Sequence, residues 1–187
     1  MGTLNETIKL LKEVICDENC KRMNKSIVRG YLGELIVLQK LKNEEFEPQH
    51  LGNQSGVDIK VHNFSIDVKT STLKDDGFGI DVWGWALLRK GKKIEYHAAI
   101  CVALDKKLDV NRYYCIYGED ITSFNSSHGR FKSVLSRFQK FPKAPIDTSS
   151  NKFKEAYQKS EQLIREGRVI EISPNGSLGS IIKNIET

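Results

Sequence analysis

The sequence predicts a mixed α/β fold, in which a β-sheet is flanked by helices. Residues 4–15 and 27–43 repeat apolar side chains at helical spacing. Residues 57–68 alternate apolar and polar side chains, which is typical of strands that bury one face. Residues 96–104 form a continuous apolar run, as expected of a central strand buried on both faces. With 187 residues, the chain is long enough for a hydrophobic core and short enough for a single domain, 1–187.

Composition places the chain among ordinary globular proteins, with 39% hydrophobic and 28% charged residues. No apolar run has the length needed to span a bilayer, so no membrane partner is expected. The first residues lack the basic and apolar segments of a secretory signal. We therefore expect a cytoplasmic protein whose four cysteines stay reduced, and their spacing completes no zinc site.

The second helix, for which Ser26 is a plausible N-cap, contains a glutamate that faces inward. Glu34 lies within the apolar stripe of this helix, and a buried lone carboxylate is costly. Glu34 should therefore have a metal ion nearby or a basic partner such as an arginine. Gly30 and Gly33 lower helix propensity, and they would let the helix approach a sheet closely.

The alternating stretch divides into two strands of a hairpin. His62-Asn63 forms the two-residue turn, in which asparagine can adopt a positive φ. A turn centred on this pair places Ile59 opposite Ile66, and these apolar side chains face a core.

The same register places two acids opposite each other on the other face. Asp58 then lies opposite Asp67, about 5 Å away at Cβ, and Lys69 projects from the same face. Two such carboxylates repel unless a cation lies between them or one is protonated. The patch therefore predicts a divalent-metal site, the alternative being a half-exposed hairpin whose charges are only solvated.

Gly-Val-Asp58, a short spacer and Asp67-Val-Lys69, with a glutamate on an upstream helix, resemble the core motif of the PD-(D/E)xK nuclease superfamily. The motif is short, and the resemblance thins beyond about residue 125. It implies a restriction-endonuclease-like mixed sheet flanked by helices, with additional C-terminal helices. It also implies catalytic roles for Glu34, Asp58, Asp67 and Lys69, and a Mg²⁺ ion (with Mn²⁺ as a substitute) held by Asp58, Asp67, the Val68 carbonyl and Glu34.

The resemblance further implies an endodeoxyribonuclease acting on double-stranded DNA. A small one-domain member most resembles a type II restriction endonuclease, usually a homodimer so that two sites cut two strands. A Holliday-junction resolvase or a homing or repair nuclease is the alternative within the superfamily. Two alternative functions involve no cleavage. The chain could be a DNA-binding module that has kept the fold, or the hairpin could be coincidental in a protein that binds RNA through its C-terminal helix.

Charge is unevenly distributed along the chain. Residues 1–125 hold 18 basic and 18 acidic side chains, whereas residues 126–187 hold 11 and 6. Apolar residues at helical spacing from Phe131 to Phe138 predict a helix, and a second helix over residues 152–166 and a late strand over residues 168–173 follow. Residues 126–187 are therefore expected to be a basic, mainly helical extension of the same domain. A polyanion partner or a solvated basic helix face would explain the charge. The candidate DNA-contacting residues are Arg89, Lys90, Lys92, Lys93, Arg130, Lys132 and Arg137.

The segment between the hairpin and the buried strand reads as a loop or a short helix. Asp75 and Asp81 are alternative metal ligands in this segment. Trp83 and Trp85 have two possible uses, stacking on bases or packing in a core, and core packing is the commoner one.

Overall fold

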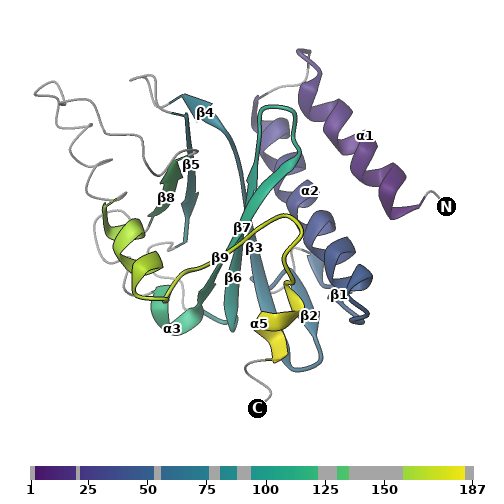
Figure 1. Cartoon of the computed structure of the whole chain (residues 1–187). Helices are drawn as coiled ribbons and strands as arrows, with labels where there is room; N and C mark the ends of the chain where they lie inside the picture. The colour runs from purple at the N-terminus through teal and green to yellow at the C-terminus, as the bar shows by residue number, and fades with distance from the viewer. Residues whose placement is uncertain are drawn as a thin grey trace, which may run out of the picture.

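The computed structural model describes residues 3–19, 22–52, 56–75, 81–87, 94–121, 130–134 and 158–183. Its main element is a six-stranded mixed sheet with helices against it (Figure 1). Helix α1 (Leu4–Cys16) packs on helix α2 (Arg22–Asn43), and α2 packs on the sheet. The predicted mixed α/β fold is therefore confirmed. No helix in these described ranges is long and apolar enough to cross a membrane.

The main sheet has the strand order β1-β2-β3-β6-β7-β9. Neighbouring strands are antiparallel except β3 and β6, which run parallel. Every residue of β6 is buried, as the apolar run predicted. The strands are β1 (Gln49–His50), β2 (Ile59–Val61), β3 (Phe64–Thr72), β6 (Ala98–Leu104), β7 (Val110–Tyr117) and β9 (Ile170–Ile172).

A second sheet lies where a loop or short helix was expected. It consists of β4 (Lys74–Asp75), β5 (Asp81–Ala86) and β8 (Arg130–Val134), in the order β4-β5-β8. The helix predicted from Phe131 onward is wrong for β8, whose backbone pairs antiparallel with β5. Helical spacing is a local signal, whereas the backbone hydrogen bonds of β8 come from a strand far away in sequence.

The C-terminal part contains both helical and strand segments, and the strand predicted over residues 168–173 is confirmed. Residues 158–165 are helical, and Gly167 follows with a φ of 72°. The chain then returns to the main sheet as β9 and ends in the short helix α5 (Gly179–Lys183). Another short helix, α3 (Gly118–Ile121), follows β7.

The hairpin has the predicted register. Ile59 pairs with Ile66, and both side chains are fully buried. The turn differs in one respect, because the residue with a positive φ is His62 (49°) rather than Asn63. Histidine is among the residues that enter this region more often than most.

Two hydrophobic cores lie on opposite faces of the main sheet. One contains the apolar stripe of α2 with residues such as Ile66 and Ile100. The other contains Trp83 and Trp85, whose indole N–H groups donate to main-chain carbonyls of β6 at 2.7 and 3.3 Å. Both tryptophans are at most 2% exposed, so the core-packing alternative is correct and base stacking is wrong.

Helix α2 starts earlier than predicted and approaches the sheet at one glycine. Ser26 is an exposed residue within the helix, so it is not the N-cap. A Cβ added at Gly33 would overlap Thr70 Oγ1 and lie 2.9 Å from Thr70 Cβ, whereas one at Gly30 would meet nothing within 4 Å. The predicted close approach thus occurs at Gly33 alone, and it brings Glu34 to the edge of β3.

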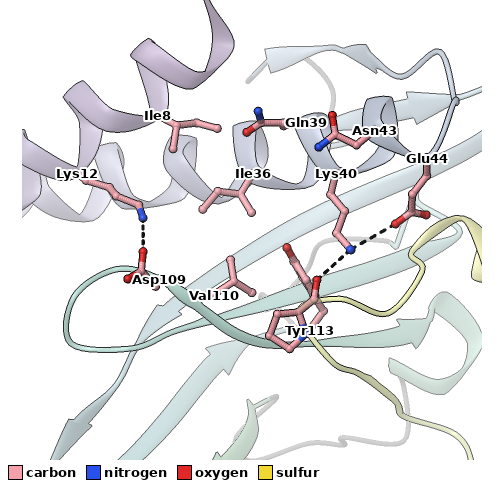
Figure 2. Close-up of a pocket in the computed structure, with 11 residues that line it drawn as sticks. Ile8, Lys12, Ile36, Gln39, Lys40, Asn43, Glu44, Asp109, Val110 and Tyr113 are labelled. Atoms are coloured by element: carbon pink, nitrogen blue, oxygen red, sulfur yellow. Dashed lines mark hydrogen bonds and ion pairs between the residues drawn. The ribbon is translucent and has the colours of Figure 1, made fainter.

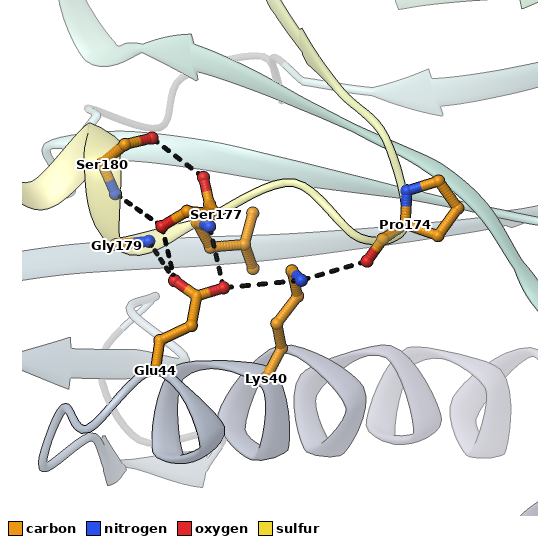
Figure 3. A network of polar contacts seen from close by, with 7 residues as sticks. Lys40, Glu44, Pro174, Ser177, Gly179 and Ser180 are labelled. Carbon is orange, nitrogen blue, oxygen red and sulfur yellow. Dashed lines mark hydrogen bonds and ion pairs between the residues drawn. The ribbon is translucent and has the colours of Figure 1, made fainter.

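The end of α2 is joined to α5 by a polar network (Figure 3). The Glu44 carboxylate accepts hydrogen bonds from the N–H groups of Leu178 (3.0 Å) and Gly179 (2.6 Å) and from the Ser177 hydroxyl (2.8 Å). Lys40 lies 3.4 Å from Glu44 and donates to the Pro174 carbonyl at 3.0 Å. This network fixes the C-terminal segment to the helix that also carries Glu34.

Candidate functional site

The Asp58 carboxylate is held against the backbone of β3 just before β2 begins. The Asp58 N–H donates to the Ile66 carbonyl at 2.9 Å, which extends the pairing of the two strands by one bond. Its Oδ2 accepts from the Val68 N–H at 2.6 Å. Because the N–H and C=O of one strand residue point to the same side, the Val68 carbonyl also lies on the Asp58 side of β3.

Asp67 and Lys69 project from the face of β3 opposite Ile66 and Val68, as strand alternation requires. Asp67 is 5% exposed, and Lys69 Nζ lies 2.5 Å from its Oδ1. The Lys69 side chain keeps 28% of its surface exposed, so its ammonium connects the buried acid with solvent. The hairpin thus brings two carboxylates, a lysine and a main-chain carbonyl to one edge of the sheet.

Glu34 adds a third carboxylate from α2. Its Oε2 lies 2.7 Å from His50 Nε2, and its side chain is 13% exposed. Burial raises the pKa of Glu34, the hydrogen bond from His50 opposes that change, and the charge of Asp58 reinforces it. Glu34 is therefore close enough to the hairpin for the charges of Asp58 and Lys69 to change its pKa.

Sequence reasoning expected a metal ion or an arginine beside Glu34 and missed His50. The four histidines share no ligand spacing, so the sequence carries no signal for this residue. His50 reaches Glu34 because β1 pairs with β2, and His50 stands opposite Ile59. The His50 ring also tilts against that of Tyr31, at 5.6 Å between centroids.

Tyr96 is a second residue that the sequence did not single out. It lies two residues before β6, and burial raises the pKa of its phenol. The charges of Asp67 and Asp58 raise that pKa further, which places the phenol within electrostatic reach of both acids. Tyr96 is thus a neutral, half-buried neighbour of the carboxylate pair.

The donor set at the hairpin suits a hard cation. Within the described ranges, no three His, Cys, Asp or Glu residues form a group that could hold a metal by themselves. Mg²⁺ does not require such a cage, because it usually keeps several waters and takes one or two protein carboxylates plus substrate phosphate. The Asp58 and Asp67 carboxylates and the Val68 carbonyl provide oxygen donors of that kind.

The alternative metal ligands lie in the second sheet. Asp75 and Asp81 are register partners there, and Asp81 forms an ion pair with Lys106 at 3.0 Å.

The structure describes only two of the predicted DNA-contacting residues. Arg130 and Lys132 belong to β8, opposite Ala86 and Gly84. Arg89, Lys90, Lys92, Lys93 and Arg137 lie outside the described residues.

A pocket of about 370 Å³ lies elsewhere, between α1, α2 and β7 (Figure 2). Its charged groups are paired with one another: Lys12 lies 2.7 Å from Asp109, and Lys40 lies 3.4 Å from Glu44. None of the predicted site residues lines it. The pocket and the hairpin are therefore separate features of the molecule.

Comparison with solved structures finds proteins of similar fold, one of which is a nuclease. No family model matches the chain, and no curated protein matches it. The structure is similar to that of a bacterial homing endonuclease, I-Ssp6803I, with 14% sequence identity and a TM-score of 0.43. The similarity covers 73% of this chain and 95% of that one.

Proposed function

We propose that this chain is a Mg²⁺-dependent endodeoxyribonuclease that cleaves phosphodiester bonds at the β2–β3 hairpin. The observation that carries the proposal is that Asp58 accepts a hydrogen bond from the N–H of Val68, the residue between Asp67 and Lys69, while Lys69 pairs with Asp67. Facing carboxylates are unfavourable without a cation, and one lysine neutralises only one of them. A divalent ion would satisfy the second charge.

The residues that would hold the ion are Asp58, Asp67 and Val68 through its carbonyl, with Glu34 nearby for a water or a second ion. A bound Mg²⁺ supplies an activated water and neutralises charge that develops on the scissile phosphate. Lys69 is a donor beside the reacting centre, where it would orient the attacking water and stabilise the phosphorane. Its ion pair with Asp67 favours this role over that of a general base.

The hydrogen bond from His50 keeps Glu34 in place at the edge of this centre. A fixed carboxylate presents its remaining lone pairs in defined directions, which helps to align a water that donates to it. His50 is therefore a positioning residue in the proposed mechanism, since it acts through Glu34.

For the biological substrate, we propose double-stranded DNA cut by a type II restriction endonuclease, acting as a homodimer so that two sites cut both strands. The net charge of +5 favours a polyanion. A Holliday-junction resolvase and a homing or repair nuclease would use the same centre. Cleavage of linear duplex at a defined sequence separates the first proposal from cleavage of a four-way junction.

The proposal is tested by incubating plasmid DNA and a synthetic four-way junction with wild type and with Asp67→Ala. With Mg²⁺, wild type should cleave, and Asp67→Ala should be slower by at least about a hundredfold because it loses a charge that holds the metal. EDTA should have the same effect as the substitution, while Asp81→Ala should retain wild-type activity.

The cleavage pattern distinguishes the candidate functions. Discrete plasmid fragments support a site-specific nuclease, and cleavage of the junction alone supports a resolvase. If Asp67→Ala cuts at the wild-type rate, the hairpin is not the active centre. If wild type cuts neither substrate, the chain is a binding module or uses another substrate.

A further inference from the structure

One face of helix α2 carries a cation for which the described residues provide no counter-charge. Lys25, Arg29 and Gly33 follow one another at intervals of four residues, so they lie along one face of the helix. Arg29 is half-buried, and its Nε has no solvent exposure and no hydrogen-bond partner in the part of the chain that the structure describes. Among these residues no carboxylate forms an ion pair with it.

The burial of Arg29 does not stabilise the fold, so stability does not explain this arrangement. Burial lowers the pKa of the Arg29 guanidinium, and no charge among the described residues offsets that effect. Arginine nevertheless stays charged in proteins, so the cost of removing its Nε–H donor from water is not recovered within the described chain. An anion that approached this face would recover it, because hydrogen bonds between a guanidinium and a phosphate are among the strong ones.

The position of Arg29 relates it to the hairpin. Gly33 packs directly on Thr70, the residue after Lys69 in β3. Arg29 lies one helical turn before Gly33, which is about 6 Å along the helix axis. The last described pairing of β2 with β3 is Ile59 with Ile66, so no described strand covers the second half of β3 on that side. A DNA strand with a phosphate at Lys69 could continue along this edge toward Arg29.

We infer that Arg29 binds a backbone phosphate of the DNA next to the scissile phosphate, and that Lys25 extends this contact along α2. The inference rests on the proposed function, since it assigns the DNA path at the same site. Guanidinium groups bind phosphate through a planar fork of donors, which fixes orientation as well as charge. Arg29 therefore positions the strand, and it carries no base specificity.

The test measures binding of a duplex oligonucleotide at several salt concentrations, in the Asp67→Ala background so that bound DNA is not cut. Arg29→Met should weaken binding about tenfold at low salt. The slope of log affinity against log salt should become shallower by about one, as expected for one lost phosphate contact. Lys42→Met removes an exposed charge from the other end of α2, and it should leave the slope unchanged.

Arg29→Lys keeps the charge but loses the fork, so it should retain the slope and lose part of the affinity. Thermal unfolding should show Arg29→Met to be at least as stable as Lys42→Met. Equal affinity and slope for Arg29→Met and Lys42→Met would overturn the inference while leaving the proposed function intact. If the parent chain binds no duplex at all, both fail.

Discussion

Two glutamates of helix α2 illustrate how surroundings set the charge of a carboxylate. Burial raises the pKa of Glu34, and a single hydrogen bond from His50 does not cancel that effect. Glu44 also loses water, but two backbone N–H groups and a hydroxyl donate to it, and the net effect is a lowered pKa. The number of donors that point at the carboxylate decides the direction together with the neighbouring charge, which is Asp58 for Glu34 and Lys40 for Glu44.

From the lowered pKa of Glu44 we predict how this residue contributes to the free energy of unfolding at different pH values. A carboxylate whose folded-state pKa is depressed stabilises the protein above its unfolded-state pKa, near 4.5, and this contribution is lost as pH falls through the folded-state value. Glu44→Gln should therefore lower the free energy of unfolding by about 1–2 kcal/mol at neutral pH. Urea denaturation should show a smaller difference from wild type in acid.

The control for this experiment is Glu47→Gln, which alters an exposed glutamate close by in sequence. It should leave the unfolding midpoint unchanged at both pH values. Equal midpoints for Glu44→Gln and Glu47→Gln at neutral pH would show that the α2–α5 network contributes nothing to stability.

Among the elements, the hairpin could be predicted in most detail, because residues close to one another in the sequence determine its structure. A two-residue turn fixes the register, and a slip by one residue would turn every buried side chain outward. The strand β8 could not be predicted in the same way, because apolar residues such as Phe131 and Val134 fit a helix as well as a strand. The pairing of β8 with β5 decides between them, and that pairing is not encoded within either segment.

The contact between α2 and β3 gives a prediction with an internal control. Gly33→Ala should destabilise the protein by about 1–3 kcal/mol, because the added methyl group would overlap Thr70 and force the helix from the strand. Gly30→Ala on the same helix meets open space, so it should gain about 0.5–1 kcal/mol in helix propensity. Urea denaturation measures both changes, and equal effects would contradict the close approach.

At the scale of the whole molecule, α2 lies between the candidate site and the C-terminal segment. It carries Glu34 at the edge of β3, and it anchors α5 through Glu44. The sequence was sufficient to nominate Glu34 together with the hairpin acids, because each stands out within its own element. His50, Tyr96 and Arg29 stand out only after the elements assemble, since their importance depends on neighbours that are distant in sequence.

The most direct test of the central claim is the binding of Mg²⁺ to the hairpin, measured by calorimetry on the metal-free protein. Wild type and Asp81→Asn should bind Mg²⁺, because Asp81 lies in the second sheet and pairs with Lys106. Asp67→Asn should lose binding, since it removes a charge that the ion requires. Mg²⁺ binding that is equal in Asp67→Asn and wild type, or absent from wild type, would contradict the claim that the hairpin is a metal centre.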